Sequence, residues 1–146
     1  MIRIAQPLLD QITAAAEAAY PLECCGLLTG RGAVGGALEV LRVVPSANLA
    51  AGDRRDSFEV DPQVRFDLMR ELGEIGDAAP GDERIIGHYH SHPDHPAEPS
   101  ARDLEMAFEP DMVWIIVGVD DGLAGVVTAH VVDPAGPAFR EIPLHT

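Results

Sequence analysis

The segment Gly87-His88-Tyr89-His90-Ser91-His92-Pro93 combines a strand-like pattern with a cluster of histidines, and four of the six histidines in the chain lie between positions 88 and 95. Side chains two residues apart on a strand point to the same face, about 6–7 Å apart along it. His90 and His92 can therefore converge on one ion. Two neutral imidazoles with one carboxylate are typical of a catalytic zinc site. The segment predicts a strand that runs into a metal centre.

A carboxylate for this centre follows a short proline-containing loop, in the sequence Ser100-Ala101-Arg102-Asp103. Ser100 has the character of a helix N-cap, which places Asp103 at the third position of a short helix. The stiff loop can return this carboxylate to the end of the histidine strand. We therefore expect His90, His92 and Asp103 to bind one zinc ion per chain, with one coordination position left open for water.

Hydrolysis at such a centre also needs a base, because zinc acidifies water but does not carry its proton to a leaving group. Our candidate is Glu23, at the start of a predicted strand over 24–29. Without the predicted metal ligands His90, His92 and Asp103, Glu23 would be interpreted as a surface carboxylate. The adjacent Cys24 and Cys25 are expected to be buried thiols, because neighbouring cysteines form a strained bridge and no C-x-x-C spacing is present.

The rest of the chain alternates helical and strand patterns. Apolar spacing and turn residues predict helices over 7–20, 61–75 and 100–108, a polar loop over 45–56, and strands over 24–29, 38–44, 58–60, 84–91, 112–119, 123–132 and 139–144. Interleaved elements favour a mixed sheet with helices on its faces. The late strands are joined by turns too short for crossovers, which excludes a doubly wound parallel fold. Residues 1–146 are expected to form one domain.

Composition restricts the function classes. The chain has 146 residues, 24 acidic against 10 basic, a net charge of −14, and no lysine. Nucleic-acid binding and adsorption to anionic membranes both need basic surfaces, and neither is expected here. An apolar content of 47% is that of a folded domain. With no signal-peptide pattern and no membrane-length apolar run, a cytoplasmic protein is expected. We interpret the acidic surface as an adaptation to a salt-rich cytoplasm.

These residues together resemble the JAMM (MPN-plus) metalloprotease motif of small stand-alone bacterial proteins. That motif has a distant Glu, then His-x-His, ten residues, then Asp, with a Ser three positions before the Asp. In this chain it corresponds to Glu23, His90, His92, Ser100 and Asp103. Asn48 and Phe58 also stand where such proteins tend to carry Asn and Phe. The resemblance extends over nearly the whole chain.

The resemblance implies an α/β three-layer α-β-α sandwich similar to cytidine deaminases. It implies zinc ligation by His90, His92 and Asp103, with Glu23 as general base and proton shuttle. Ser100 would stabilise the tetrahedral oxyanion. The implied activity is that of a zinc metallopeptidase acting at the C-terminus of a ubiquitin-like sulfur-carrier protein, whose extended Gly-Gly tail would add to a sheet edge. The short 45–56 loop would wall that groove and disfavours a deubiquitinase in the narrow sense.

Several alternatives stay open at this point. His88 shares the face of His90 and His92, so a three-histidine site competes with a packed histidine, which we favour. His95 is read as a solvated loop residue rather than part of a substrate rim. The rival function is a catalytically silent MPN-type scaffold or binding module. Zinc deaminases need H-x-E and P-C-x-x-C, which the chain lacks. Nothing in the sequence indicates the oligomeric state.

Overall fold

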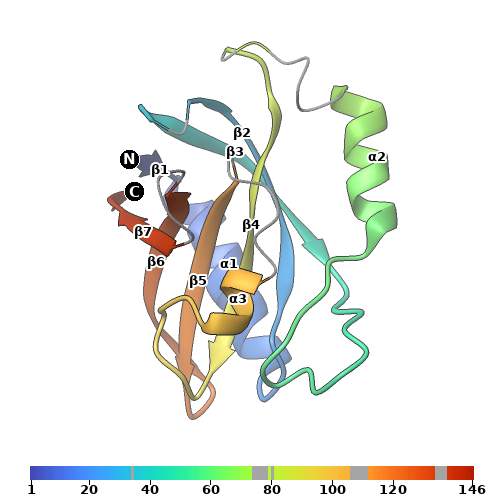
Figure 1. Cartoon of the computed structure of the whole chain (residues 1–146), viewed down its shortest axis with the longest axis vertical. Helices are drawn as coiled ribbons and strands as arrows, with labels where there is room; N and C mark the ends of the chain where they lie inside the picture. The colour runs from blue at the N-terminus through green and yellow to red at the C-terminus, as the bar shows by residue number, and fades with distance from the viewer. Residues whose placement is uncertain (34, 74–78, 80, 106–111, 134–137) are drawn as a thin grey trace.

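A computed structural model describes residues 1–33, 35–73, 79, 81–105, 112–133 and 138–146 (Figure 1). Its elements, in chain order, are β1 (Ile2–Arg3), α1 (Gln6–Ala19), β2 (Cys25–Gly32), β3 (Leu38–Ser46), α2 (Pro62–Leu72), β4 (Arg84–Pro93), α3 (Ala101–Glu105), β5 (Val113–Asp120), β6 (Leu123–Asp133), β7 (Ala138–Ile142) and β8 (Leu144–His145). None of the described helices has the length and apolar character needed to cross a membrane.

The strands form one mixed sheet in the order β7-β6-β5-β4-β2-β3-β1-β8. The strand that carries the histidines, β4, pairs antiparallel with β2 and parallel with β5. Parallel strands need a long crossover connection, and the segment between β4 and β5, which includes α3, is long enough to provide one. As predicted, the later strands are antiparallel, since a tight turn joins β5 to β6.

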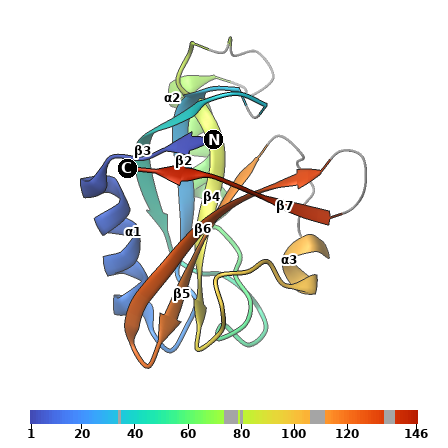
Figure 2. The same cartoon turned by 90° about the vertical axis from the view of Figure 1, so that its left-hand side faces the viewer.

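Helices cover both faces of the sheet, which confirms the three-layer α-β-α architecture. Successive residues on a strand face opposite sides. Accordingly, Leu28 and Ile86 join the apolar cluster under α1, whereas Leu27 and Ile85 join the cluster under α2. Figure 2 shows α1 and α3 on opposite sides of the sheet.

The second helix begins as its sequence predicts. The Asp61 carboxylate accepts a hydrogen bond from the backbone N–H of Gln63 at 2.9 Å, and Pro62 occupies the first helical turn. Both features are favourable at a helix N-terminus, where backbone N–H groups lack helical partners. Ile75, the last apolar residue of the predicted helical pattern, lies outside the described residues.

The predicted last strand, 139–144, is wrong as a single edge strand. It is split by Pro143 into β7 and β8, which lie at opposite ends of the strand order. Ile2 N–H donates to the Pro143 carbonyl at 2.9 Å, and Ile4 N–H donates to the His145 carbonyl at 2.9 Å. The C-terminal segment thus reaches from one side of a curled sheet to the other (Figure 2).

Two further expectations need correction or restriction, and one short strand was not predicted. The predicted strand at 58–60 is only an isolated bridge between Val60 and Asn48. The two-residue β1 had no detectable pattern, because periodicity needs several residues. The helix predicted over 100–108 is described as α3 only as far as Glu105, and its last residues lie outside the described part.

Candidate metal centre

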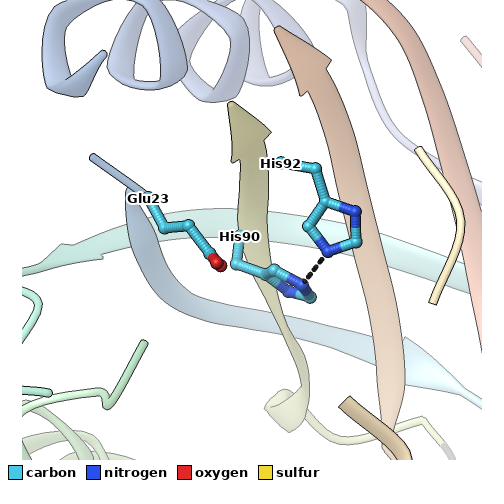
Figure 3. A group of neighbouring side chains, drawn as sticks. All are labelled: Glu23, His90 and His92. Carbon is cyan, nitrogen blue, oxygen red and sulfur yellow. Dashed lines mark hydrogen bonds between the residues drawn. The ribbon is translucent and has the colours of Figure 1, made fainter. Parts of the chain in front are cut away.

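The two histidines of the H-x-H pattern lie side by side at the C-terminal end of β4. His90 is fully buried and His92 is 7% exposed. Their Nε2 atoms are 3.0 Å apart, and Figure 3 shows the two rings turned toward one another. The two-residue repeat of a strand explains why both side chains lie on one face, and the orientation of the rings brings their Nε2 atoms closer than the repeat of about 6–7 Å.

Asp103 from α3 completes a compact group. Its Oδ1 is 3.2 Å from His90 Nε2, and its Oδ2 is 3.1 Å from His92 Nε2. Zinc ligands lie about 2.0–2.1 Å from the ion, so the edges of a tetrahedral site are about 3.3 Å long. Two imidazole nitrogens and a carboxylate at these separations fit a zinc ion with little adjustment.

Hydrogen bonds and ring packing orient the two imidazoles. His92 donates from Nδ1 to the Pro96 carbonyl at 2.8 Å, so whenever the ring is neutral its Nε2 carries a lone pair that can bind a metal. This is the usual second contact of a metal-binding histidine. The His90 ring stacks on Phe58 with centroids 4.3 Å apart and planes 17° apart. The loop after β4, through Pro96, and the segment before α2, through Phe58, therefore both set ring positions.

Ser100 holds Asp103 through two reciprocal hydrogen bonds. The Ser100 backbone N–H donates to Asp103 Oδ2 at 2.8 Å, and the Asp103 N–H donates to Ser100 Oγ at 3.0 Å. Leu104 N–H donates to the Ser100 carbonyl, so Ser100 is the N-cap of α3 as predicted. Because Oγ is used here as an acceptor, the Ser100 hydroxyl hydrogen is still available to donate.

The electrostatics of the group suit cation binding. Burial opposes ionisation of Asp103, but hydrogen bonds from His90 and His92 outweigh it and hold the pKa of this carboxyl well below its usual range. Burial lowers the pKa of His90, which favours the neutral form of its ring. Burial likewise disfavours charge on His92, yet the bond to Asp103 raises the pKa of His92 overall. A metal ion would compete with a proton at His92.

Glu23 lies beside the histidines although it is far from them in sequence. Antiparallel pairing of β2 with β4 sets Cys25 opposite His90, which brings Glu23 to the same end of the sheet (Figure 3). Glu23 is 4% exposed, and one oxygen lies within 4.8 Å of a nitrogen on each of His90 and His92. A cavity of about 450 Å³, the central cavity, opens here and is lined by Glu23, Asp56, His92, His95, Pro96, Glu98, Pro99 and Ser100.

Asn48 fastens the backbone next to Glu23. Its Nδ2 donates to the carbonyls of Glu23 and Ser57 at 3.1 and 2.9 Å, and its Oδ1 accepts from the N–H groups of Ala50 and Glu59 at 3.0 and 3.1 Å. The side-chain amide therefore uses all four of its hydrogen-bonding positions. Sequence reasoning noted Asn48 only through the family resemblance, since a lone Asn in a loop carries no signal of its own.

A profile of prokaryotic homologues of the JAB domain matches residues 5–130. The chain belongs to this family. Among curated proteins, this JAB-domain chain is 35% identical over 122 residues to Desampylase of Haloferax volcanii, covering 84% of this chain and 76% of that protein. Its fold is shared with a solved protein of Desulfitobacterium hafniense (TM-score 0.76, 29% identity, 99% and 91% of the two chains covered). It is also shared with a JAB1/MPN domain protein of Archaeoglobus fulgidus (TM-score 0.58, 19% identity, 99% and 95% covered).

The other histidines of the JAB-domain chain separate into distinct roles. His88 packs edge-on against Trp114, with ring centroids 4.1 Å apart, and burial lowers its pKa to about 3. His88 also lies 5.6 Å from Phe58, centroid to centroid, so its ring is enclosed by aromatic side chains, as expected for a packed histidine. His95 is exposed on the rim of the central cavity.

Ser91 and the cysteines are structural in this JAB-domain fold. Ser91 Oγ accepts a hydrogen bond from the Cys24 backbone N–H at 2.8 Å, so it positions the strand end beside Glu23. Cys24 and Cys25 are free and buried, as predicted. No pattern in the sequence indicated that the Pro96 carbonyl would hold His92, because a backbone acceptor has no residue-type signature.

Burial raises the pKa of the Cys24 thiol and raises that of Cys25 to about 12. At pH 8 the thiolate fraction of Cys25 is then on the order of one in ten thousand. We expect neither cysteine to react with iodoacetamide in the folded protein within an hour, and both to react in guanidinium chloride. Intact-mass spectrometry measures this. Native alkylation at the rate of a free thiol would contradict it.

Proposed function

We propose that this chain is a zinc-dependent metallopeptidase that hydrolyses a peptide or isopeptide bond at the C-terminus of a ubiquitin-like sulfur-carrier protein. The observation that carries the proposal is the convergence of His90, His92 and Asp103 within 3.0–3.2 Å, with buried Glu23 beside them. In this proposal the first three residues bind one zinc ion per chain. Similarity to the Desampylase of Haloferax volcanii supports the substrate class.

Each site residue has a task in the proposed reaction. Bound zinc would supply a Lewis acid that acidifies water and polarises the scissile carbonyl. Glu23 accepts the proton of the attacking water and delivers it to the departing nitrogen, so that an amine rather than an amide anion leaves. The Ser100 hydroxyl, whose oxygen already accepts the Asp103 N–H, donates to the developing oxyanion.

The carrier tail is proposed to approach along the loop between β3 and α2. A second cavity, of about 160 Å³, lies between this loop and the metal centre, and we call it the tail-side cavity. It is lined by Ala50, Ala51, Gly52, Asp56, Ser57, Phe58, Glu59 and Asp103. Small residues at 50–52 leave room for an extended Gly-Gly backbone. Asp103 lines the tail-side cavity. A tail bound there could therefore present its terminal carbonyl to the metal centre.

The catalytically silent scaffold is the less favoured alternative. A binding module has no need of a buried carboxylate beside two histidines, because burying charge costs free energy unless the group is paired or used. Retention of Glu23, His90, His92, Ser100 and Asp103 at one end of the sheet supports catalysis instead.

The direct test uses a ubiquitin-like carrier that ends in Gly-Gly and bears a C-terminal peptide extension. The zinc-loaded protein should convert it to the mature carrier, with the mass loss of the extension seen by intact-mass spectrometry. A chelator should stop the reaction, and added zinc should restore it. A chain that holds zinc but leaves this fusion and a lysine-linked carrier conjugate uncleaved would favour the scaffold reading.

Asn48→Asp should lower kcat about 10- to 100-fold while zinc content and KM stay near wild type. The change removes both Nδ2 donations and places an anionic oxygen against the carbonyls of Glu23 and Ser57, so the base shifts from its productive position. Steady-state kinetics and elemental analysis measure this, with circular dichroism to verify folding. An unchanged kcat in a folded variant would show that Asn48 does not position the base.

A further inference from the structure

One sheet edge near the metal centre is open. β6 pairs with β5 along most of its length, but with β7 only over Ala129–Asp133. In the described part of the chain, the stretch from Leu123 to Thr128 therefore has a strand neighbour on one side alone. Glu17 accepts the Ala124 backbone N–H at 2.9 Å, which caps the far end of this edge. An open edge of this kind is a template for an added strand.

A groove of about 720 Å³ lies beside this edge, on the face of the sheet that carries the histidines. We call it the β6 groove. Its floor includes Gly118, where Ala97 of the loop after β4 approaches closely, and Thr128, whose hydroxyl donates to the Ala97 carbonyl at 2.6 Å. Val126 also lines the groove and is 67% exposed, so a bound segment could bury this apolar side chain.

The β6 groove continues the proposed substrate path. The tail-side and central cavities share Asp56, and the central cavity and the β6 groove share His95, Pro96 and Glu98. The three spaces therefore follow one another with the metal centre in the middle. If the carrier tail enters from the tail-side cavity, the chain beyond the scissile bond leaves toward β6.

The β6 groove is negatively charged, which favours a positively charged ligand. Exposed carboxylates of Asp94, Glu98, Asp120 and Glu141 line it, and no arginine of the described chain does. An extended segment with lysine or arginine side chains would pair with these carboxylates while its backbone follows the open edge.

We propose that the β6 groove binds an extended, basic segment of the protein to which the carrier is joined, on the leaving-group side of the scissile bond. This proposal rests on the metallopeptidase function above and adds its leaving-group specificity. The open edge supplies backbone pairing, Val126 an apolar contact, and the carboxylates of Glu98 and Glu141 the preference for positive charge.

The test compares two carrier fusions that differ only in the extension, one rich in lysine and arginine and one rich in glutamate. The wild-type protein should cleave the basic fusion with a lower KM, by about three- to tenfold, and the advantage should shrink as salt rises. The double variant Glu98→Gln/Glu141→Gln should lose most of the preference. Asp67→Asn on α2, which removes a charge remote from the groove, should retain it.

A binding measurement separates this proposal from the proposed function. Fluorescence anisotropy of a labelled basic peptide should show saturable binding to the wild-type protein and about three- to tenfold weaker binding to the Glu98→Gln/Glu141→Gln variant. If neither fusion is cleaved but the peptide binds in this way, the proposed metallopeptidase function is contradicted, whereas the proposed binding of a basic segment in the β6 groove is supported. Cleavage of both fusions with equal KM, or peptide binding unaffected by the double variant, would overturn the groove proposal.

Discussion

Glu23→Gln is expected to keep one zinc ion per chain and to lose most of the activity, with kcat falling by about 10²–10⁴-fold. Glutamine has nearly the same shape as glutamate, but its amide cannot accept and return a proton at neutral pH. The Glu23 backbone is fixed independently of this substitution, because its N–H donates to the Arg54 carbonyl at 2.7 Å and its carbonyl accepts from Asn48. The side chain should therefore stay in place while the proton transfer is lost.

The decisive measurements are kcat on the extended carrier and zinc content by elemental analysis, made on the same preparation. Glu71→Gln is a matched control, since Glu71 is an exposed residue of α2 whose contact with Arg42 is 3.3 Å long. It should behave as wild type. Full activity in Glu23→Gln would rule out the general-base role. Loss of zinc from it would instead place Glu23 among the ligands, which its proximity to His90 and His92 would also allow.

Asp103→Asn should lower zinc affinity by more than about 100-fold. Losing a residue that only hydrogen-bonds to a metal ligand lowers affinity by up to about 100-fold, and the loss of a ligand itself should exceed that. An amide oxygen carries no net charge, and its NH₂ group would face His90 and His92 where the carboxylate now accepts. Activity should fall in parallel and recover in part when zinc is added in excess, because Glu23 and Ser100 are unchanged.

Titration of the metal-free protein with zinc against a chromogenic chelator measures this affinity. Asp56→Asn removes a carboxylate from the same cavities without touching the three converging residues, and its zinc affinity should stay within a few-fold of wild type. Zinc affinity in Asp103→Asn equal to that of wild type would exclude Asp103 as a ligand.

Much of the fold could be predicted because its signals are local. The Asp61 cap and Pro62 start α2, and Ser100 starts α3, through contacts within one helical turn. The antiparallel course of β5 and β6 follows from the tight turn between them. The split of 139–144 into two strands could not be predicted, because it depends on β1, whose two residues carry no pattern and gain their place only by pairing with β3 and β8.

The candidate site likewise has features that local sequence patterns predict and features that depend on tertiary contacts. By itself the sequence determined that His90 and His92 share a strand face and that a capped carboxylate follows at Asp103, because both are relations between near neighbours in the chain. Only the tertiary structure decided that Glu23 lies beside them, that Asn48 holds its backbone and that the Pro96 carbonyl orients His92. The physical reason is that strand pairing and loop closure are chosen by burial summed over the whole sheet, so contacts between distant segments leave no local pattern.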